Sequence, residues 1–161
     1  MTQSLWDFSV ALYARPRVAG LCLALQDEAG ADVCLLLAAL WLERRGVAAS
    51  PARVARLEEL ARPWQATVTT PLRGLRRAWK DAAQGDAVLA ELRGQLAALE
   101  LQAERRLLER LQGLSADWAV ASEGRAGNWL EALAATWPSV SAEHRAALQQ
   151  LRSAATELTQ P

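Results

Sequence analysis

The strongest feature of the hydrophobic pattern is an apolar run of ten residues from Val33 to Leu42, with a charged residue on each side. A helix that is apolar on every face must be surrounded by other elements. The run has about half the length that a membrane-spanning helix needs. Asp32 can cap its start, and the basic residues that follow Glu43 suit its end. We therefore expect a central buried helix over 33–45.

Two shorter helical segments precede this run. Ser4 and Asp7 have the spacing of a capping box, with aspartate in place of the usual glutamate, which predicts a short helix over about 5–14. Pro16 suits the first turn of a second helix, and Gly30 suits its left-handed end. The apolar residues of this second helix are expected to face the core.

Two further helical segments are expected after the central run. Ser50 followed by Pro51 is a strong helix start. Pro63 is expected to break or kink this helix, and the threonines that follow it suggest a second bend or a short non-helical joint. Asp86 can cap the longest helix, expected over 86–113, in which leucines three and four apart form a coiled-coil seam beside a second apolar line. Two apolar lines predict two packing partners for this helix.

The C-terminal third is less regular. The stretch 115–127 is weakly patterned, and Gly124 to Gly127 reads as a loop. A helix is expected after Asn128, and a last helix is expected to start at Ser141.

Composition supports a helical fold. Alanine and leucine dominate, isoleucine is absent, and glycine and proline number nine and six. We expect an all-α chain: a single compact bundle of about seven or eight helices that forms one domain over 1–161. No export signal is visible at the start of the chain, so the expected location is the cytoplasm.

Charge is uneven along the chain, although the formal net charge is zero. Residues 44–80 contain nine basic and two acidic side chains. The candidate binding residues of this segment are Arg73, Arg76, Arg77 and Lys80, with Trp64 and Trp79 as stacking partners. The spacing of the four basic residues predicts one exposed face, opposite Leu72, Leu75 and Trp79. This face is either a solvated surface that pairs with the acidic long helix, a site for phosphate or RNA, or a docking surface for an acidic protein.

Polar residues also occur among apolar ones in the N-terminal third. The candidates for a polar pocket are Asp7, Tyr13, Gln26, Asp27 and Asp32. If these side chains are buried, they need hydrogen-bond partners, so they form either a structural network or a ligand pocket. Asp7 and Asp32 could carry out acid–base chemistry only if they converge.

The motifs of common enzyme sites are missing from the sequence. It contains no His-x-x-x-His pair, no cysteine cluster, no Walker loop and no Gly-x-Ser-x-Gly elbow. We therefore expect no metal and no cofactor. Cys22 and Cys34 read as small buried residues.

The N-terminal third resembles a known family. The residues that carry the likeness are Leu5-Trp6-Asp7-Phe8-Ser9, Tyr13, Cys22 to Asp27, and Gly30-Ala31-Asp32-Val33 leading into three leucines and Trp41. They resemble conserved hypothetical proteins of Gram-negative bacteria, a domain of unknown function, and the likeness extends loosely to Lys80. The resemblance implies a cytoplasmic all-α domain in which these positions and the Arg73 segment share one surface or pocket. It implies no reaction.

Three functions follow in order of preference. The first is a non-catalytic accessory or adaptor protein that binds a protein partner, either another protein or a second copy of itself. The second is a binder of an anionic ligand, a phosphorylated small molecule or RNA, through residues 62–80. The zero net charge disfavours nucleic acid, and no membrane contact is expected. The third is an enzyme that uses Asp7, Tyr13 and Asp32 in an N-terminal pocket.

Overall fold

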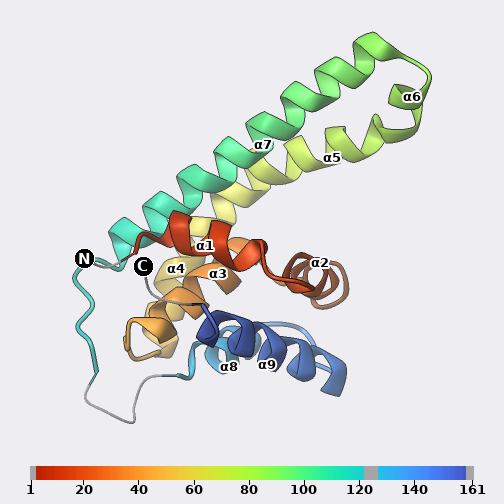
Figure 1. Ribbon diagram of the computed structural model, residues 1–161. Coiled ribbons are helices and arrows are strands. Elements are labelled where there is room, and N and C mark those ends of the chain that lie inside the picture. Colours follow the sequence, from red (N-terminus) through yellow and green to blue (C-terminus); the bar gives the residue numbers. More distant parts are fainter. Residues whose placement is uncertain (1–2, 122–126, 159–161) are drawn as a thin grey trace.

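The chain folds into helices throughout the part that the structure describes. The computed structural model describes residues 3–121 and 127–158. Within these ranges the only β-type pairing is an isolated antiparallel bridge between Val47 and Val120. The all-α prediction is therefore confirmed (Figure 1). The elements are α1 (Leu5–Tyr13), α2 (Val18–Ala29), α3 (Val33–Arg44), α4 (Pro51–Trp64), the π-helix η1 (Gln65–Thr69), α5 (Thr70–Ala78), α6 (Lys80–Gln84), α7 (Ala87–Leu114), α8 (Trp129–Ala134) and α9 (Ala142–Thr156).

Helix α3 lies at the centre of the fold, as its apolar sequence predicts. Every side chain from Cys34 to Leu42 is at most 6% exposed. Helices α1, α2, α4, α7, α8 and α9 all contact α3, and Figure 1 shows it between α1 and the C-terminal helices. Each fully buried leucine contributes roughly 1.5 to 3 kcal/mol to folding, so α3 supplies a large share of the stability. No single described helix is long and apolar enough to span a bilayer; α1 and α2 would pass only as a pair, and they meet at 101°.

Capping hydrogen bonds confirm the predicted helix starts. The side chains of Ser4, Asp32, Ser50 and Asp86 each accept a hydrogen bond from the backbone N–H three positions later, at 3.0 to 3.2 Å. Gly30 has a φ of 72°, a left-handed conformation that glycine adopts without a steric cost. It ends α2 and lets the chain turn into α3 two residues later.

Of the two outcomes predicted for Pro63, a break or a kink of the helix, the break is wrong. Helix α4 continues through Pro63 into η1, and α5 follows without an interruption. Pro63 lacks the N–H that an α-helical turn needs, and it lies in the last turn of α4, two residues before the π-helix begins. The hydroxyl of Thr67 donates a 2.8 Å hydrogen bond to the carbonyl of Pro63. The threonines therefore support a wide turn instead of ending the helix.

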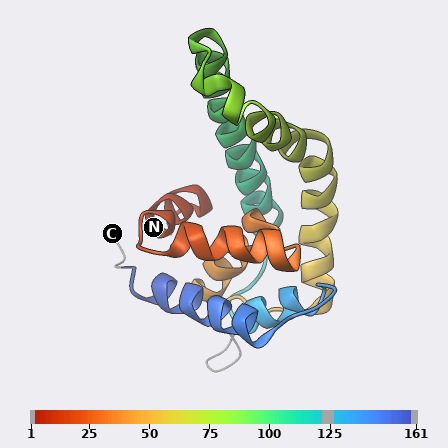
Figure 2. The ribbon, with the colours of Figure 1, turned by 90° about the vertical axis from the view of Figure 1, so that its right-hand side faces the viewer.

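Residues 70–100 form a helical hairpin that projects from the body of the molecule, and we call it the arm (Figures 1 and 2). It consists of α5, α6 and the first half of α7, which pack on one another. The long helix is confirmed, since α7 has 28 residues. The expectation that both of its apolar lines are covered is wrong, because Leu92, Leu99 and Leu101 are 46% to 54% exposed. Leu101 is two positions from Leu99 and lies on a different side of the helix, so residues of both apolar lines are exposed to solvent.

The segment after α7 returns to the body. The ring of Trp118 stacks on that of Trp129 with centroids 5.8 Å apart. The indole N–H of Trp129 donates a 2.7 Å hydrogen bond to the carbonyl of Val47, beside the bridge from Val47 to Val120. Of the predicted loop at 124–127, only Gly127 lies within the described residues.

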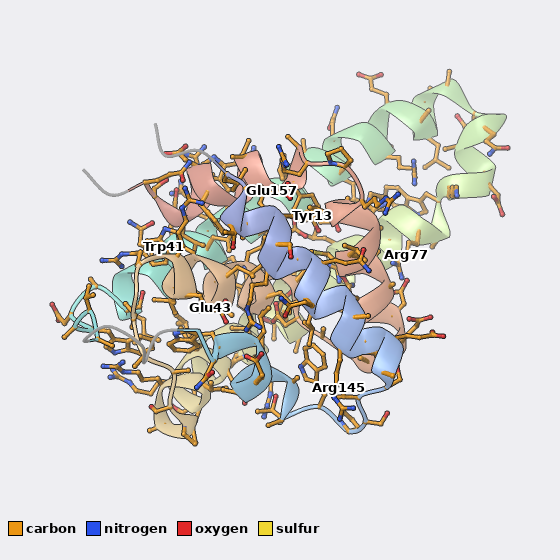
Figure 3. All side chains as sticks on the ribbon, turned by 60° about the horizontal axis from the view of Figure 1, so that its bottom comes forward. Tyr13, Trp41, Glu43, Arg77, Arg145 and Glu157 are labelled. Atoms are coloured by element: carbon orange, nitrogen blue, oxygen red, sulfur yellow. The ribbon has the colours of Figure 1, made fainter. Side chains whose placement is uncertain are left out.

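Glu43, at the end of α3, ties the two C-terminal helices to the core (Figure 3). Its carboxylate accepts hydrogen bonds from the backbone N–H groups of Trp129 at 3.1 Å and Leu130 at 3.3 Å, at the start of α8. It also pairs with the guanidinium of Arg152 in α9 at 2.7 and 2.9 Å. The side chain of Glu43 is only 9% exposed. A nearly buried carboxylate needs such partners, and here they join three helices.

Candidate functional site

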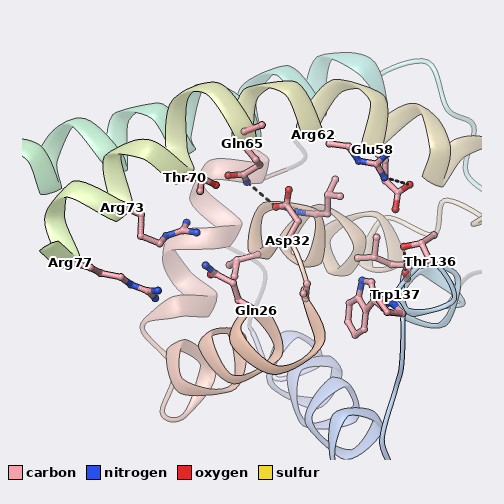
Figure 4. A pocket seen from close by; sticks show the side chains of 18 residues that line it. Gln26, Asp32, Glu58, Arg62, Gln65, Thr70, Arg73, Arg77, Thr136 and Trp137 are labelled. Atoms are coloured by element: carbon pink, nitrogen blue, oxygen red, sulfur yellow. Dashed lines mark hydrogen bonds and ion pairs between the residues drawn. The ribbon is translucent and has the colours of Figure 1, made fainter.

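A cleft of about 690 Å³ opens between the base of the arm and the body. Its walls are the α2–α3 junction, the continuous run of α4, η1 and α5, and the segment around the end of α8 (Figure 4). The polar side chains along it are Gln26, Asp32, Glu58, Arg62, Gln65, Thr70, Arg73, Arg77 and Thr136. The cleft therefore brings two of the polar candidates of the N-terminal third, Gln26 and Asp32, together with Arg73 and Arg77.

Asp32 and Gln65 form the centre of the cleft. The Asp32 carboxylate accepts a hydrogen bond from the backbone N–H of Leu35 at 3.2 Å and one from the Gln65 side-chain amide at 3.0 Å. The hydroxyl of Thr69 donates to the Gln65 carbonyl oxygen, which fixes the orientation of the amide. Burial raises the pKa of Asp32, although these hydrogen bonds act in the opposite direction. The carboxylate is thus held in place by partners from α3 and η1.

One end of the cleft is cationic. The guanidinium of Arg73 is 17% exposed and lies 3.3 Å from Glu100 and 3.4 Å from Glu104 of α7. The guanidinium of Arg77 is 53% exposed, and its nearest acidic partner is Asp27 at 3.7 Å. Arg73 is therefore largely neutralised by the long helix, whereas Arg77 has only a weak, solvated pair.

The opposite end of the cleft is apolar. Leu133, Trp137 and Pro138 line it, and Figure 4 shows Trp137 at the far end from Arg73 and Arg77. Arg62 and Glu58 lie at the rim of this end and form an i,i+4 pair at 3.5 Å, with the Arg62 side chain 79% exposed. An elongated cleft with a cationic end, a hydrogen-bonding centre and an apolar end can hold an amphipathic anionic ligand.

The predicted single basic face is not formed. Arg76 points toward α7, where its guanidinium lies 2.5 Å from Glu100, and it does not line the cleft. Glu100 itself is only 6% exposed, whereas Leu75, expected on the buried side, is 46% exposed. The acidic residues of α7 attract two of the arginines, so α5 presents these arginines to α7 and leaves apolar residues in solvent. Lys80 is exposed at the start of α6, away from the cleft lining.

The two candidate tryptophans also lie elsewhere. The indole N–H of Trp64 donates a 3.0 Å hydrogen bond to the carbonyl of Ala103, and the guanidinium of Arg110 covers its ring at 4.4 Å. Trp79 is partly buried between α5 and α6. Neither ring lines the cleft.

The candidate polar pocket is divided. Gln26 and Asp32 line the cleft, and Asp27 pairs with Arg77 beside it. Asp7 accepts a 2.7 Å hydrogen bond from the Ser4 hydroxyl in an exposed helix cap. Asp7 and Asp32 are thus not brought together as cleft residues.

Tyr13 lies outside the cleft, beside Cys22 (Figure 3). Burial raises the pKa of the Tyr13 phenol, and the neighbouring Cys22 thiol raises it further. Burial likewise raises the pKa of Cys22 to about 11 and that of the buried Cys34. These groups are therefore protonated at neutral pH, so none of them supplies a base or a thiolate nucleophile.

The cleft residues that were not named as candidates from the sequence include Gln65, Thr70, Arg62 and Trp137. The signal for Gln65 and Thr70 was the Pro63-to-Pro71 stretch, which was interpreted as a break but forms the wide turn that aims Gln65 at Asp32. Trp137 carries no local signal, because it reaches the cleft only through the docking of α8. Within the described ranges, no group of three His, Cys, Asp or Glu side chains is placed to hold a metal ion.

A family model described as a protein of unknown function (DUF2390) matches residues 4–111. The match covers about two thirds of the chain, and the chain belongs to this family. It contains every wall of the cleft except the segment around the end of α8. Searches of curated proteins and of solved structures gave no match.

Proposed function

We propose that the protein is a non-catalytic accessory protein that binds an acidic segment of a protein partner in the cleft between α2–α3 and α4–α5. The observation that carries this proposal is the convergence of two distant parts of the family-matched region, around Asp32 and around Arg73, on one cleft with a cationic and an apolar end. Asp32 and Gln65 together give this cleft a fixed polar centre.

The charges of the cleft favour a carboxylate ligand. Its cations are Arg62, Arg73 and Arg77, and its anions are Asp32 and Glu58. An oxygen of the Asp32 carboxylate already accepts hydrogen bonds from Leu35 and Gln65. Arg73 already has two carboxylate partners, so the cleft lacks the several unengaged cations that a polyphosphate requires. A single carboxylate can pair with the planar fork of Arg77.

The shape of the cleft favours a chain segment. A volume of about 690 Å³ lies within the usual range for ligand sites, roughly 300 to 1,000 Å³. The distance between the Arg77 end and the Trp137 end separates a charged subsite from an apolar one (Figure 4). A peptide with an acidic residue followed by a large apolar one matches both subsites, whereas a small anion uses only the first.

The chemistry of the cleft fits binding. At the centre of the cleft, the carboxylate of Asp32 has one oxygen engaged by Leu35 and Gln65. It caps α3, so its proton transfer would disturb the start of the central helix. This arrangement suits a rigid recognition surface.

A peptide display library selected on the intact chain tests the proposal. The expected result is enrichment of peptides that pair Asp or Glu with a nearby aromatic or aliphatic residue. The enriched peptide should bind the Arg77→Glu variant about tenfold more weakly or worse, a loss of ~1.4 kcal/mol or more. Arg56→Glu is the matched control, because Arg56 is exposed on α4 and does not line the cleft.

Two results would contradict the proposal. The proposed carboxylate subsite would be wrong if the enriched peptides lacked acidic residues. It would also be wrong if Arg77→Glu and Arg56→Glu weakened binding equally. Failure to enrich any peptide, together with millimolar binding of inorganic phosphate or succinate that Arg77→Glu abolishes, would replace the peptide ligand with a small anion.

A further inference from the structure

The arm carries an uncovered apolar surface on the side that faces away from the cleft. Leu75, Val88, Leu92 and Leu99 are 46%, 70%, 46% and 50% exposed. A groove of about 400 Å³ between α5 and α7 leads into this surface and is lined by Val68, Leu72, Leu75, Leu99 and Gln102. The cleft uses a different face of α5, through Thr70, Arg73 and Arg77. An apolar strip of this kind on a projecting hairpin indicates an interface.

The strip on α7 has the spacing of a coiled-coil seam. Its positions are four and three residues apart in alternation: Val88, Leu92, Gln95, Leu99, Gln102 and Arg106. The neighbouring face of α7, which includes Glu100, Ala103 and Leu107, is buried against the rest of the chain. The seam is therefore presented to solvent by a helix that is already fixed in place by its other face.

The charges beside the seam differ between its two ends. Near the tip of the arm are the three acidic residues Asp81, Asp86 and Glu91 and the two basic residues Lys80 and Arg93. At the root are Arg105, Arg106 and Arg110, with Glu109 between them. A partner helix that is basic where the tip lies and acidic where the root lies would complement both ends. The antiparallel α7 of a second copy has this arrangement.

The spacing of the seam is symmetric about its midpoint, and this symmetry pairs each apolar position of one copy with a polar position of the other. When two copies run antiparallel with the two-fold axis near Ala97, Leu92 lies opposite Gln102 of the partner, and Gln95 lies opposite Leu99. Val88 then packs on the aliphatic stem of the partner's Arg106. The guanidinium of Arg106 pairs with Glu109 of its own chain at 2.9 Å, and in the dimer it exchanges that pair for Glu91 of the other copy. Every position meets its counterpart twice, which is the property of a closed isologous dimer.

We infer that two copies of this chain associate through antiparallel packing of their α7 seams along the arm. The inference goes beyond the proposed function, because the cleft on the other face of α5 stays open in both copies. The seam from Val88 to Arg106 is about 27 Å long at 1.5 Å per residue. A contact of this length is at the small end of specific interfaces, so the dimer is reversible and depends on concentration.

Sedimentation velocity over a hundredfold range of concentration, up to about 0.5 mM, tests the inference. The wild-type chain should shift from monomer toward dimer, and added salt should weaken the shift. Leu92→Asp should remain monomeric throughout. Val10→Asp is its control, because Val10 is also exposed, at 51%, but lies on α1. Circular dichroism of both variants checks that the fold is retained.

A charge exchange gives the sharper result. Glu91→Arg alone and Arg106→Glu alone should each weaken the dimer at least tenfold, because each places like charges across the seam. The Glu91→Arg, Arg106→Glu double variant should restore dimerisation to near the wild-type level. A wild-type chain that stays monomeric at the highest concentration overturns the inference. So does a dimer that Leu92→Asp leaves intact or that the double variant fails to restore.

Discussion

The side-chain amide of Gln65 donates a 3.0 Å hydrogen bond to the carboxylate of Asp32, which lies 33 residues earlier in the chain. This bond joins the π-helical turn to the start of the central helix. Gln65 is the first residue of that turn, and its side chain lines the cleft. The same pair is the centre of the candidate binding site.

Replacement of Asp32 should separate the role of its charge from the role of its oxygen. Asp32→Asn keeps the acceptor for Leu35 and Gln65, so it should be as stable as the wild type or more stable at pH 7. Asp32→Ala removes the helix cap and should cost about 1 to 2 kcal/mol. Urea unfolding measures both, and an Asn variant as damaged as the Ala variant would contradict this account.

The pH dependence of the Asp32→Asn effect follows from the raised pKa of Asp32. A carboxyl whose folded-state pKa is raised binds its proton more tightly in the folded chain. The wild type therefore loses stability as pH rises from the unfolded-state pKa, about 3.9, through the folded-state pKa. The advantage of Asp32→Asn over the wild type should be larger at pH 7 than at pH 4.

Arg73 and Arg76 should contribute to stability, and Arg77 should not. The double variant Arg73→Gln, Arg76→Gln leaves Glu100, which is 6% exposed, without its two guanidinium partners. The expected loss is about 1 to 3 kcal/mol. Arg77→Gln removes only an exposed pair and should cost less than ~0.5 kcal/mol. A thermal melt in which Arg77→Gln loses as much stability as the double variant would contradict the pairing of Arg73 and Arg76 with Glu100.

Glu100 and Glu104 are one helical turn apart and should respond oppositely to neutralisation. Burial raises the pKa of Glu104, and the charge of Glu100 raises it further. Burial also acts on Glu100, but the hydrogen bonds from Arg76 and Arg73 prevail and lower its pKa. At pH 7, Glu104→Gln should be neutral or stabilising, whereas Glu100→Gln should be destabilising.

The pH profiles of these two variants provide the check. The stability contributed by Glu100 is present above its unfolded-state pKa, about 4.3, and is lost as pH falls through its lower folded-state pKa. The cost of ionising Glu104 disappears as pH falls below its raised pKa. Guanidinium unfolding at pH 4 and pH 7 should therefore bring both variants closer to the wild type at pH 4. Variants with the same sign at pH 7 would disprove the assignment.

Arg152 should hold α8 and α9 to the core. Arg152→Met leaves the nearly buried Glu43 without its ion pair, at an expected cost of about 2 to 4 kcal/mol. Hydrogen exchange of the Trp129 and Leu130 amides, which donate to Glu43, should become faster. Arg145→Met on the same helix is the control, since Arg145 is exposed. Equal effects of the two variants would contradict the role of the Arg152–Glu43 pair in holding α8 and α9 to the core.

The features that the sequence predicted are those set by neighbouring residues. Ser4, Asp32, Ser50 and Asp86 start helices through bonds to backbone groups three positions away, so they are readable locally. The ten apolar residues from Val33 to Leu42 require burial whatever surrounds them. These signals were sufficient for the all-α class and the central helix.

The features that the sequence did not predict depend on which element lies opposite. Pairing of the basic residues with the acidic long helix was one of the predicted alternatives. The sequence did not show that Arg73 and Arg76 would turn to Glu100, more than 20 residues away, while Arg77 would not. Gln65 reaches Asp32 only because a π-helical turn replaces the expected break. Trp137 joins the cleft only after Glu43 anchors α8. Some of the residues that form the candidate site could therefore be recognised from the sequence. The way in which they come together could not.

The most direct test of the cleft as the binding site is a nitrogen-15 NMR titration of the intact chain with the peptide selected by display. The account predicts that the side-chain signals of Gln65, Arg77 and Trp137 shift together and saturate at one peptide per chain. The Arg56 signal should stay in place. Shifts confined to the arm groove around Leu75 and Leu99, or the absence of any change at Gln65 and Arg77, would contradict it.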